Sequence, residues 1–131
     1  MIDIENDVFD FVFPYVSELV PPGGFVSEYV HAPAAMPCAT LMEMDNATDM
    51  RLRSTADAED FATLTYEANA YAASKRECRA VMAGIDEGMT ALGFSRMSMR
   101  FTPNLEDSRV YRMTARYEAN ATAQKVIYRK R

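Results

Sequence analysis

The stretch FATLTYEANAYAASKRECRAVMAGIDEGMTALG, residues 61 to 93, decides the fold class. Its first part, residues 61 to 72, alternates between two sets of side chains, as a strand with one buried face does. Next comes the capping box Ser74-Lys75-Arg76-Glu77, in which Ser74 accepts from the amide three residues on and Glu77 reaches back. Apolar residues follow at steps of three and four, until Gly93 supplies a left-handed stop. A strand therefore leads into an amphipathic helix.

Upstream of this unit, residues 3 to 20 predict another amphipathic helix, with an apolar stripe from Ile4 to Leu19 that includes Phe11. Asp3 stands at the N-cap position. An interior proline removes a backbone hydrogen bond, so Pro14 predicts a kink or a break near Phe13.

Two strands, residues 25 to 31 and 38 to 44, are expected between the helices, followed by a long exposed polar loop over residues 45 to 60. Downstream, residues 96 to 102 and 110 to 119 alternate as a hairpin, and residues 121 to 131 read as a basic tail. The predicted order is α-β-β-β-α-β-β in a single α+β domain over residues 1 to 131. Two helices are expected on one face of a mostly antiparallel sheet.

Charge is divided unevenly along the chain. Residues 1 to 60 hold twelve acids and two bases, whereas residues 61 to 131 hold seven acids and twelve bases. If the halves form different faces, the acidic face of one copy can meet the basic face of the next, in a head-to-tail contact that closes into a ring. Alternatively, folding interleaves the halves and the asymmetry averages out.

The sequence contains no recognisable catalytic or metal-binding constellation. Its one histidine, His31, has no partner at ligand spacing, and the acidic clusters lack the spacing and glycine of a calcium loop. Cys38 and Cys78 lie forty positions apart, which favours buried, reduced thiols. We therefore predict a protein that is not an enzyme and needs no cofactor. The acidic start and the lack of a long apolar run predict a cytoplasmic protein.

Direct nucleic-acid binding is disfavoured. The hairpin arginines and tyrosines alternate onto opposite faces and cannot build one stacking platform. The net charge of −5 also opposes phosphate binding. A subunit interface suits these arginines better.

Several stretches of the sequence together resemble the tail-completion, or tail-terminator, proteins of long-tailed phages and prophages. They are Met1 to Phe9, Phe25 to Val30 leading to Pro33 and Pro37, Leu64 to Tyr71, and Pro103 to Asp107 followed by Val110-Tyr111-Arg112. The resemblance covers nearly the whole chain, and it rests on overall pattern because the family offers no enzymatic motif to transfer.

The resemblance implies an α/β subunit that assembles into a ring, with a hexamer expected, that caps the tail tube. Its partners would be the tail tube protein and a head-closure or neck protein. Its place would be the host cytoplasm during assembly and then the head-tail junction of the virion. A head-closure or neck-connector protein is the alternative within the virion. A cytoplasmic adaptor that binds a peptide or small ligand on its open sheet, and an enzyme of unseen chemistry, are the alternatives outside it.

The ring interpretation predicts which residues meet at the subunit interface. They are Arg96, Arg100, Arg112 and Arg116 of the hairpin, and Asp49, Asp57, Glu59 and Asp60 of the loop. Reversing Arg112 and Arg116 to Glu is expected to weaken assembly in a salt-dependent way while the fold stays intact.

Overall fold

The computed structural model describes residues 1–28, 35–48, 61–103 and 109–129. Its elements are α1 (Glu5–Val16), β1 (Phe25–Val26), β2 (Cys38–Thr48), β3 (Phe61–Ala72), α2 (Lys75–Leu92), β4 (Ser95–Thr102), β5 (Tyr111–Thr122) and β6 (Ile127–Arg129). The predicted α+β class and the predicted order of the first seven elements are confirmed. The short strand β6 was not predicted, because it lies in the segment expected to be a tail.

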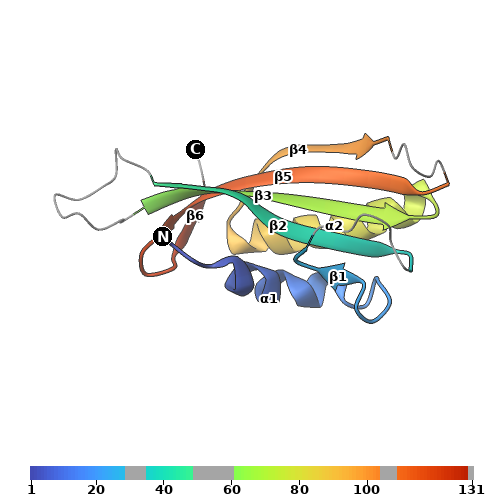
Figure 1. The fold of residues 1–131 in the computed structure, drawn as a ribbon, viewed down its shortest axis with the longest axis horizontal. Coiled ribbons are helices and arrows are strands. Elements are labelled where there is room, and N and C mark those ends of the chain that lie inside the picture. Colours follow the sequence, from blue (N-terminus) through green and yellow to red (C-terminus); the bar gives the residue numbers. More distant parts are fainter. Residues whose placement is uncertain (29–34, 49–60, 104–108, 130–131) are drawn as a thin grey trace.

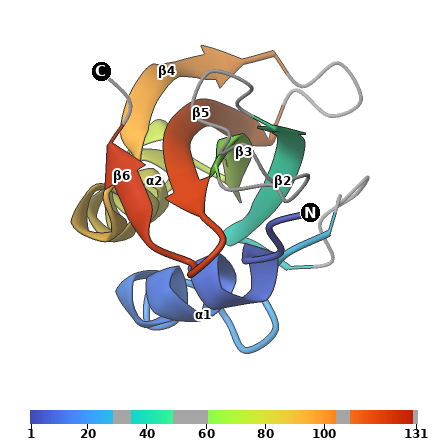
Figure 2. The same ribbon diagram turned by 90° about the vertical axis from the view of Figure 1, so that its left-hand side faces the viewer.

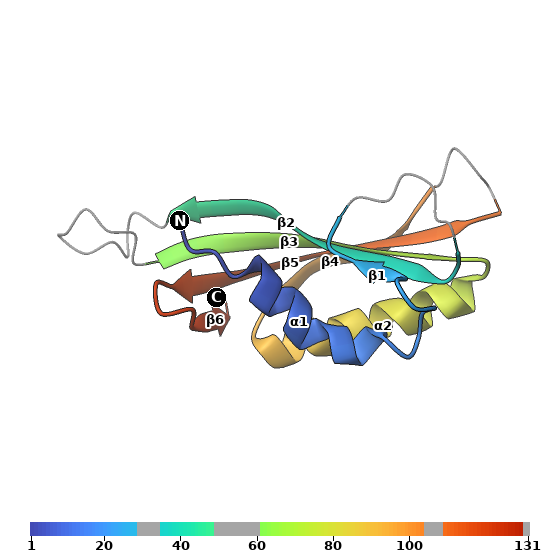
Figure 3. The same cartoon turned by 60° about the horizontal axis from the view of Figure 1, so that its bottom comes forward.

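The strands form one sheet in the order β1-β2-β3-β5-β4, and β6 pairs with β5 beyond the end of β4. All pairs are antiparallel except β1 with β2, which is parallel. Figures 1 and 3 show both helices on the same side of this sheet. The sheet is strongly twisted and curls around the helices, as the view along the strands shows (Figure 2). The prediction of two helices on one sheet face therefore holds.

The core lies between the sheet and the two helices. From β3 it takes Ala62, Leu64, Tyr66, Ala68 and Ala70, every second residue of the strand. Many of these strand positions are alanines, so the helices can approach the sheet closely. The larger volume comes from fully buried side chains elsewhere: Val8, Val12 and Val16 of α1, Met82, Ile85 and Met89 of α2, and Phe94 and Tyr117.

The helix α2 follows its sequence signals closely. Ser74 is its N-cap, and the Ser74 hydroxyl accepts from the backbone N–H of Glu77 at 3.2 Å. Gly93 ends the helix with a left-handed φ of 108°, a conformation that glycine adopts without steric cost. The helices touch at Gly84 and Gly88, where a methyl group would come within 2.6 Å of the Tyr15 carbonyl and 3.1 Å of the Val12 side chain respectively. Small residues therefore set the distance between α1 and α2.

The helix α1 departs from its prediction at both ends. It begins at Glu5 with Ile4 as N-cap, and no side chain caps it, so the assignment of Asp3 as N-cap is wrong. It continues through Pro14, so the predicted break near Phe13 does not occur, and it ends at Val16, two residues later. Leu19 lies beyond the end and is 41% exposed, so the predicted apolar stripe stops at Val16.

Two strands also differ in length from expectation. Residues 45 to 48 belong to β2, which continues past a bulge between Glu43 and Asp45, whereas the sequence predicted a loop from residue 45 onward. The sequence did not indicate a strand here because most of these side chains are polar and neither face of the strand is buried. The remaining predicted loop, residues 49 to 60, lies outside the described residues. Of the predicted strand over residues 25 to 31, only Phe25–Val26 pairs within the described part.

Candidate interaction surface

The fold keeps the oppositely charged parts of the chain on different sides. The described residues from 1 to 48 carry eight acidic side chains and no basic one, and those from 61 to 129 carry five acidic and ten basic ones. In the sheet, β1 and β2 lie on one side of β3, while β5 and β4 lie on the other. Figures 1 and 2 show α1 and β4 at opposite sides of the molecule. Among the described residues, folding therefore keeps most of the acidic side chains apart from most of the basic ones.

The acidic side consists of the N-terminal segment, α1 and β2. Its carboxylates are Asp3, Glu5, Asp7, Asp10, Glu18, Glu43 and Asp45. Burial raises the pKa of Glu43, against the lowering effect of hydrogen bonds with Asn46 and Tyr66. The Tyr66 hydroxyl donates to Glu43 Oε1 at 3.3 Å. One base reaches this side, since Lys125 Nζ lies 3.4 Å from the Asp7 carboxylate, with both side chains well exposed.

The N-terminal residues also close the outer edge of β2. The backbone N–H of Glu43 donates to Glu5 Oε2 at 2.8 Å, and the Asn46 side-chain amide donates to the backbone carbonyl of Ile2, also at 2.8 Å. Nearer the start of β2, β1 pairs with Ala39 and Thr40. At the opposite side of the sheet, none of the described strands pairs with the outer edge of β4. The sheet thus has one covered edge and one open edge.

The basic side consists of β4, the first half of β5 and the first turn of α2. Arg100, Arg112 and Arg116 share the sheet face that points away from the helices, because they stand on alternate register positions. Arg100 is exposed and forms no ion pair within the described residues. Arg116 is also exposed and lies 3.9 Å from the Glu67 carboxylate. Arg100 is therefore free to meet a partner, and Arg116 is exposed enough to reach one beside its contact with Glu67.

Arg112 is tied into the fold more firmly than the sequence suggested. Its Nε donates to Asn69 Oδ1 at 3.0 Å, and its guanidinium lies 5.7 Å from the centre of the Tyr71 ring. Asn69 is buried and also accepts from the Thr114 hydroxyl at 2.8 Å. Arg112→Glu would remove a donor from a buried amide, so the expectation that this reversal leaves the fold intact does not suit the structure.

Arg96 does not share the face of the other three arginines, and this part of the prediction is wrong. A bulge between Arg96 and Ser98 adds one residue, so Arg96 pairs with Tyr117 on the helix side of the sheet. There its guanidinium lies 3.5 Å from the Asp86 carboxylate of α2. Asp86 also accepts from the buried Tyr117 hydroxyl at 2.8 Å. Arg96 therefore joins β4 to α2 as part of an internal network.

The other residues predicted for the interface cannot be placed. Asp49, Asp57, Glu59 and Asp60 lie outside the described residues, as does His31. The two cysteines are within them, and both are buried and free, as predicted. Burial raises the pKa of Cys78 to about 11, and its thiol donates to the Ala70 carbonyl at 3.1 Å. Such a thiol is a poor nucleophile because it keeps its proton.

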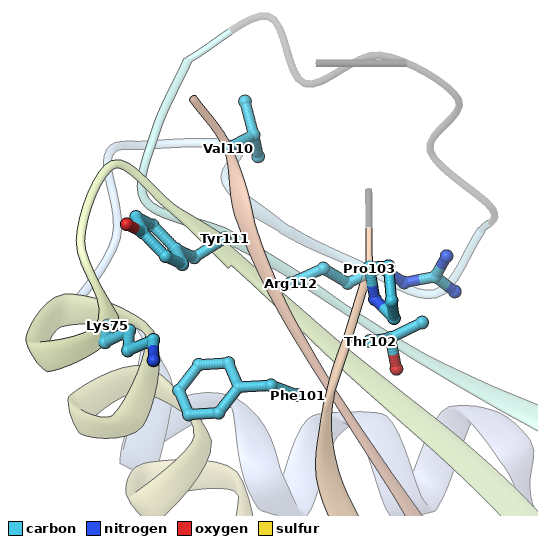
Figure 4. A pocket seen from close by; sticks show the side chains of 7 residues that line it. All are labelled: Lys75, Phe101, Thr102, Pro103, Val110, Tyr111 and Arg112. Carbon is cyan, nitrogen blue, oxygen red and sulfur yellow. The ribbon is translucent and has the colours of Figure 1, made fainter. Parts of the chain in front are cut away.

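A pocket of about 340 Å³ lies beside the first turn of α2, between the end of β4 and the start of β5 (Figure 4). We call it the cationic pocket. Its lining is mostly apolar and includes two cationic residues, Lys75 on the helix side and Arg112, whose side chain extends to the opposite sheet face and donates to Asn69. The lining residues are Lys75, Phe101, Thr102, Pro103, Val110, Tyr111 and Arg112. Such a lining suits an apolar group that carries a negative charge.

Phe101 lies near two cations of α2 at the pocket. Lys75 Nζ lies 5.5 Å from the centre of its ring, and the Arg79 guanidinium lies 5.2 Å from it. Figure 4 shows the Lys75 ammonium directed at the ring. These are cation–π distances. The sequence does not reveal this group, because residues 74 to 77 indicate only the start of a helix and nothing in the sequence places Lys75 and Arg79 beside Phe101.

No protein-family model and no curated protein matches the chain. Among the described residues, no three His, Cys, Asp or Glu side chains are grouped so that they could hold a metal ion. None of the described helices is long and apolar enough to cross a membrane. The most distinctive feature of the described surface is that one side is acidic and the opposite side is basic.

Proposed function

We propose that this chain is a structural protein that assembles head to tail into a closed ring, as its resemblance to phage tail-completion proteins implies. In that role it would end the tail tube and join it to the head or neck of the virion. The observation that carries the proposal is the separation of charge, with α1 and β2 acidic and the β4 side basic. Opposite sides of one subunit then match each other between neighbours.

The form of the contact follows from its asymmetry. A two-fold dimer built on either charged side alone would place that side against itself, basic against basic or acidic against acidic. Repulsion between like charges opposes that arrangement. A head-to-tail contact pairs the acidic side of one copy with the basic side of the next, and it ends only when the chain of subunits closes. A ring is therefore favoured over a dimer.

The open edge of β4 supports the same geometry. An edge strand presents unpaired backbone groups that can pair with another chain, and proteins often protect such edges with charged side chains. Exposed Arg100 on β4 opposes pairing between two β4 strands, because each copy would bring its own arginine. It does not oppose an acidic neighbour. The charge on this edge thus favours an acidic partner and leaves the backbone of the edge accessible.

The alternative with a specific observation in its favour is an adaptor that binds a peptide or small ligand. The cationic pocket, with its mostly apolar lining, is a feature that such a protein would use. The open sheet face is less suitable, because hydrogen bonds already join its polar side chains, as between Thr102 and Thr114 at 2.8 Å. A protein that stays monomeric at all concentrations would favour the adaptor.

Electron microscopy of the negatively stained protein at low salt tests the proposal. Closed rings of uniform size are expected, and they should dissolve into single subunits as salt is raised, since screening weakens contacts between exposed charges. Monomers alone at low salt and high concentration would contradict the ring and favour the adaptor.

A further inference from the structure

We propose that the cationic pocket of one copy binds the outward face of α1 from a second copy. This inference rests on the proposed function, because it names the contact by which a head-to-tail assembly would form. It makes a narrower claim than the separation of charge, since it commits to one pocket and one helix.

The pocket offers a cation beside apolar surface. Lys75 stands at the first position of α2, where the helix N-terminus adds partial positive charge. Phe101, Pro103 and Val110 supply apolar lining, and the Tyr111 side chain closes one side (Figure 4). The described residues that line the pocket include no carboxylate. A complementary surface would carry carboxylates next to exposed aromatic rings.

The outward face of α1 has that composition. Asp10 on this face, and Glu18 just after the end of the helix, are exposed and form no ion pair within the described residues. Phe11 and Phe13 flank this face at 42% and 44% exposure, although rings of this size are usually buried. Phe13 lies 6.2 Å from Phe25, and Phe11 lies 6.2 Å from Tyr15, so each ring has a neighbour on one side and solvent on the other. Carboxylates and half-exposed rings therefore occur together.

The two surfaces do not meet within one subunit. The helix α1 crosses α2 at Gly84 and Gly88, whereas Lys75 lies nine residues before Gly84, a distance of about 13 Å along the helix axis. Asp10 points away from α2, because Val8, Val12 and Val16 fill the inward side of α1. A contact between pocket and helix thus requires two copies, and it is heterologous, with different surfaces on each side.

Lys75→Glu is the variant that tests the contact. It places a carboxylate in the pocket, where it would repel Asp10 of the neighbour. The fold should tolerate it, since Lys75 is exposed and an acidic residue in the first turn favours a helix. Arg76→Glu is the matched control: it makes the same change of charge at the next residue, which is exposed and does not line the pocket. Thermal unfolding by circular dichroism verifies that both variants fold.

Sedimentation velocity at low salt measures assembly in the wild type, both single variants and the double variant Lys75→Glu/Asp10→Lys. Lys75→Glu is expected to weaken self-association about tenfold or more, a change typical of a charge reversal at a contact, while Arg76→Glu has a clearly smaller effect. The double variant should recover much of the loss, because its pocket and helix again carry opposite charges.

The outcomes separate this inference from the proposed function. A wild type that assembles together with a Lys75→Glu variant that assembles equally well would overturn the pocket contact and leave the ring. Equal losses in Lys75→Glu and Arg76→Glu, with no recovery in the double variant, would also overturn it, because general repulsion would then explain the loss. A monomeric wild type would overturn both proposals.

Discussion

The Glu5 carboxylate accepts a hydrogen bond of 2.8 Å from the backbone N–H of Glu43, at the outer edge of β2. Together with the hydrogen bond from Asn46 to Ile2 and the pairing of β1, this contact makes the two edges of the sheet unequal. The N-terminal segment covers the acidic edge, whereas β4 at the other end pairs with no further strand among those described. A subunit with two different edges can join its neighbours head to tail, but it is poorly suited to a dimer in which equivalent sheet edges of two copies pair.

Loss of the Glu5 carboxylate should destabilise the protein and uncover the β2 edge. We expect Glu5→Ala to lower the free energy of unfolding by about 1–3 kcal/mol, the range for a hydrogen bond to a charged group. Asp7→Ala is the matched control, since it removes the same charge from an exposed ion pair worth at most about 1 kcal/mol. Urea denaturation of both variants measures the difference. Equal losses would show that the Glu43 contact contributes no more than surface charge.

The network around Asp86 should be asymmetric in its response to mutation. Asp86→Ala leaves the buried Tyr117 hydroxyl without its acceptor, at a cost of about 1–3 kcal/mol. Tyr117→Phe removes the hydroxyl and leaves Asp86 with Arg96 and solvent, so its cost should be nearer about 1 kcal/mol. Denaturation of the two single variants and the double variant provides the comparison. A double variant as unstable as the sum of both would mean that the hydrogen bond contributes nothing.

Two glycines of α2 should respond differently to an added methyl group. Alanine gains roughly 1 kcal/mol over glycine in a helix interior. At Gly84 the added Cβ would lie 2.6 Å from the Tyr15 carbonyl oxygen. That oxygen belongs to the backbone and cannot move away as the end of a flexible side chain can, so Gly84→Ala should destabilise the protein despite that gain. At Gly88 the nearest atoms are side-chain atoms at 3.1 Å, so Gly88→Ala should cost less. Melting temperatures of both variants test this order, and a stabilised Gly84→Ala would contradict the packing of α1 on α2.

Alkaline pH should destabilise the protein through its buried thiol. The pKa of Cys78 rises from 9.0 to about 11 on folding because burial disfavours the thiolate. The folded state therefore binds its proton more tightly than the unfolded state. The corresponding stability is complete below pH 9 and is lost as pH rises toward 11, at about 1.4 kcal/mol for each unit of pKa.

Burial also raises the pKa values of Tyr66 and Tyr117, so the tyrosines add to this alkaline loss. Cys78→Ala isolates the thiol contribution. The variant should lose stability less steeply than the wild type between pH 9 and pH 11, as measured by urea denaturation at several pH values. Parallel curves for the two proteins would show that Cys78 does not titrate in this way.

Much of the fold could be predicted because local signals agree with the packing. Ser74, Glu77 and Gly93 mark both ends of α2, and the alternation of β3 survives as its burial pattern. The errors occurred where local pattern and packing diverge. The end of β2 is polar on both faces and was taken for a loop, and β6 is a short strand that depends on β5 for its pairing. No periodicity in the sequence reveals either.

The candidate surface was predicted less completely than the fold. Arg100 and Arg116 lie exposed on the expected face, but a single bulged residue moved Arg96 to the other side of the sheet. Strict alternation in the sequence gives no sign of that bulge. Arg112 lies on the predicted face and is engaged with Asn69. The cationic pocket depends on residues from three elements, and only the fold brings these together.

The mass of the protein in solution, measured by light scattering at low and high salt, tests the head-to-tail account most directly. The wild type should form one species of several copies, near six by the resemblance, at low salt and dissociate at high salt. Arg100→Glu, which changes an exposed residue with no ion pair in the described part of the chain, should shift low-salt samples toward the monomer. A wild type that is monomeric at every salt and concentration, or a ring unaffected by salt and by Arg100→Glu, would contradict the account.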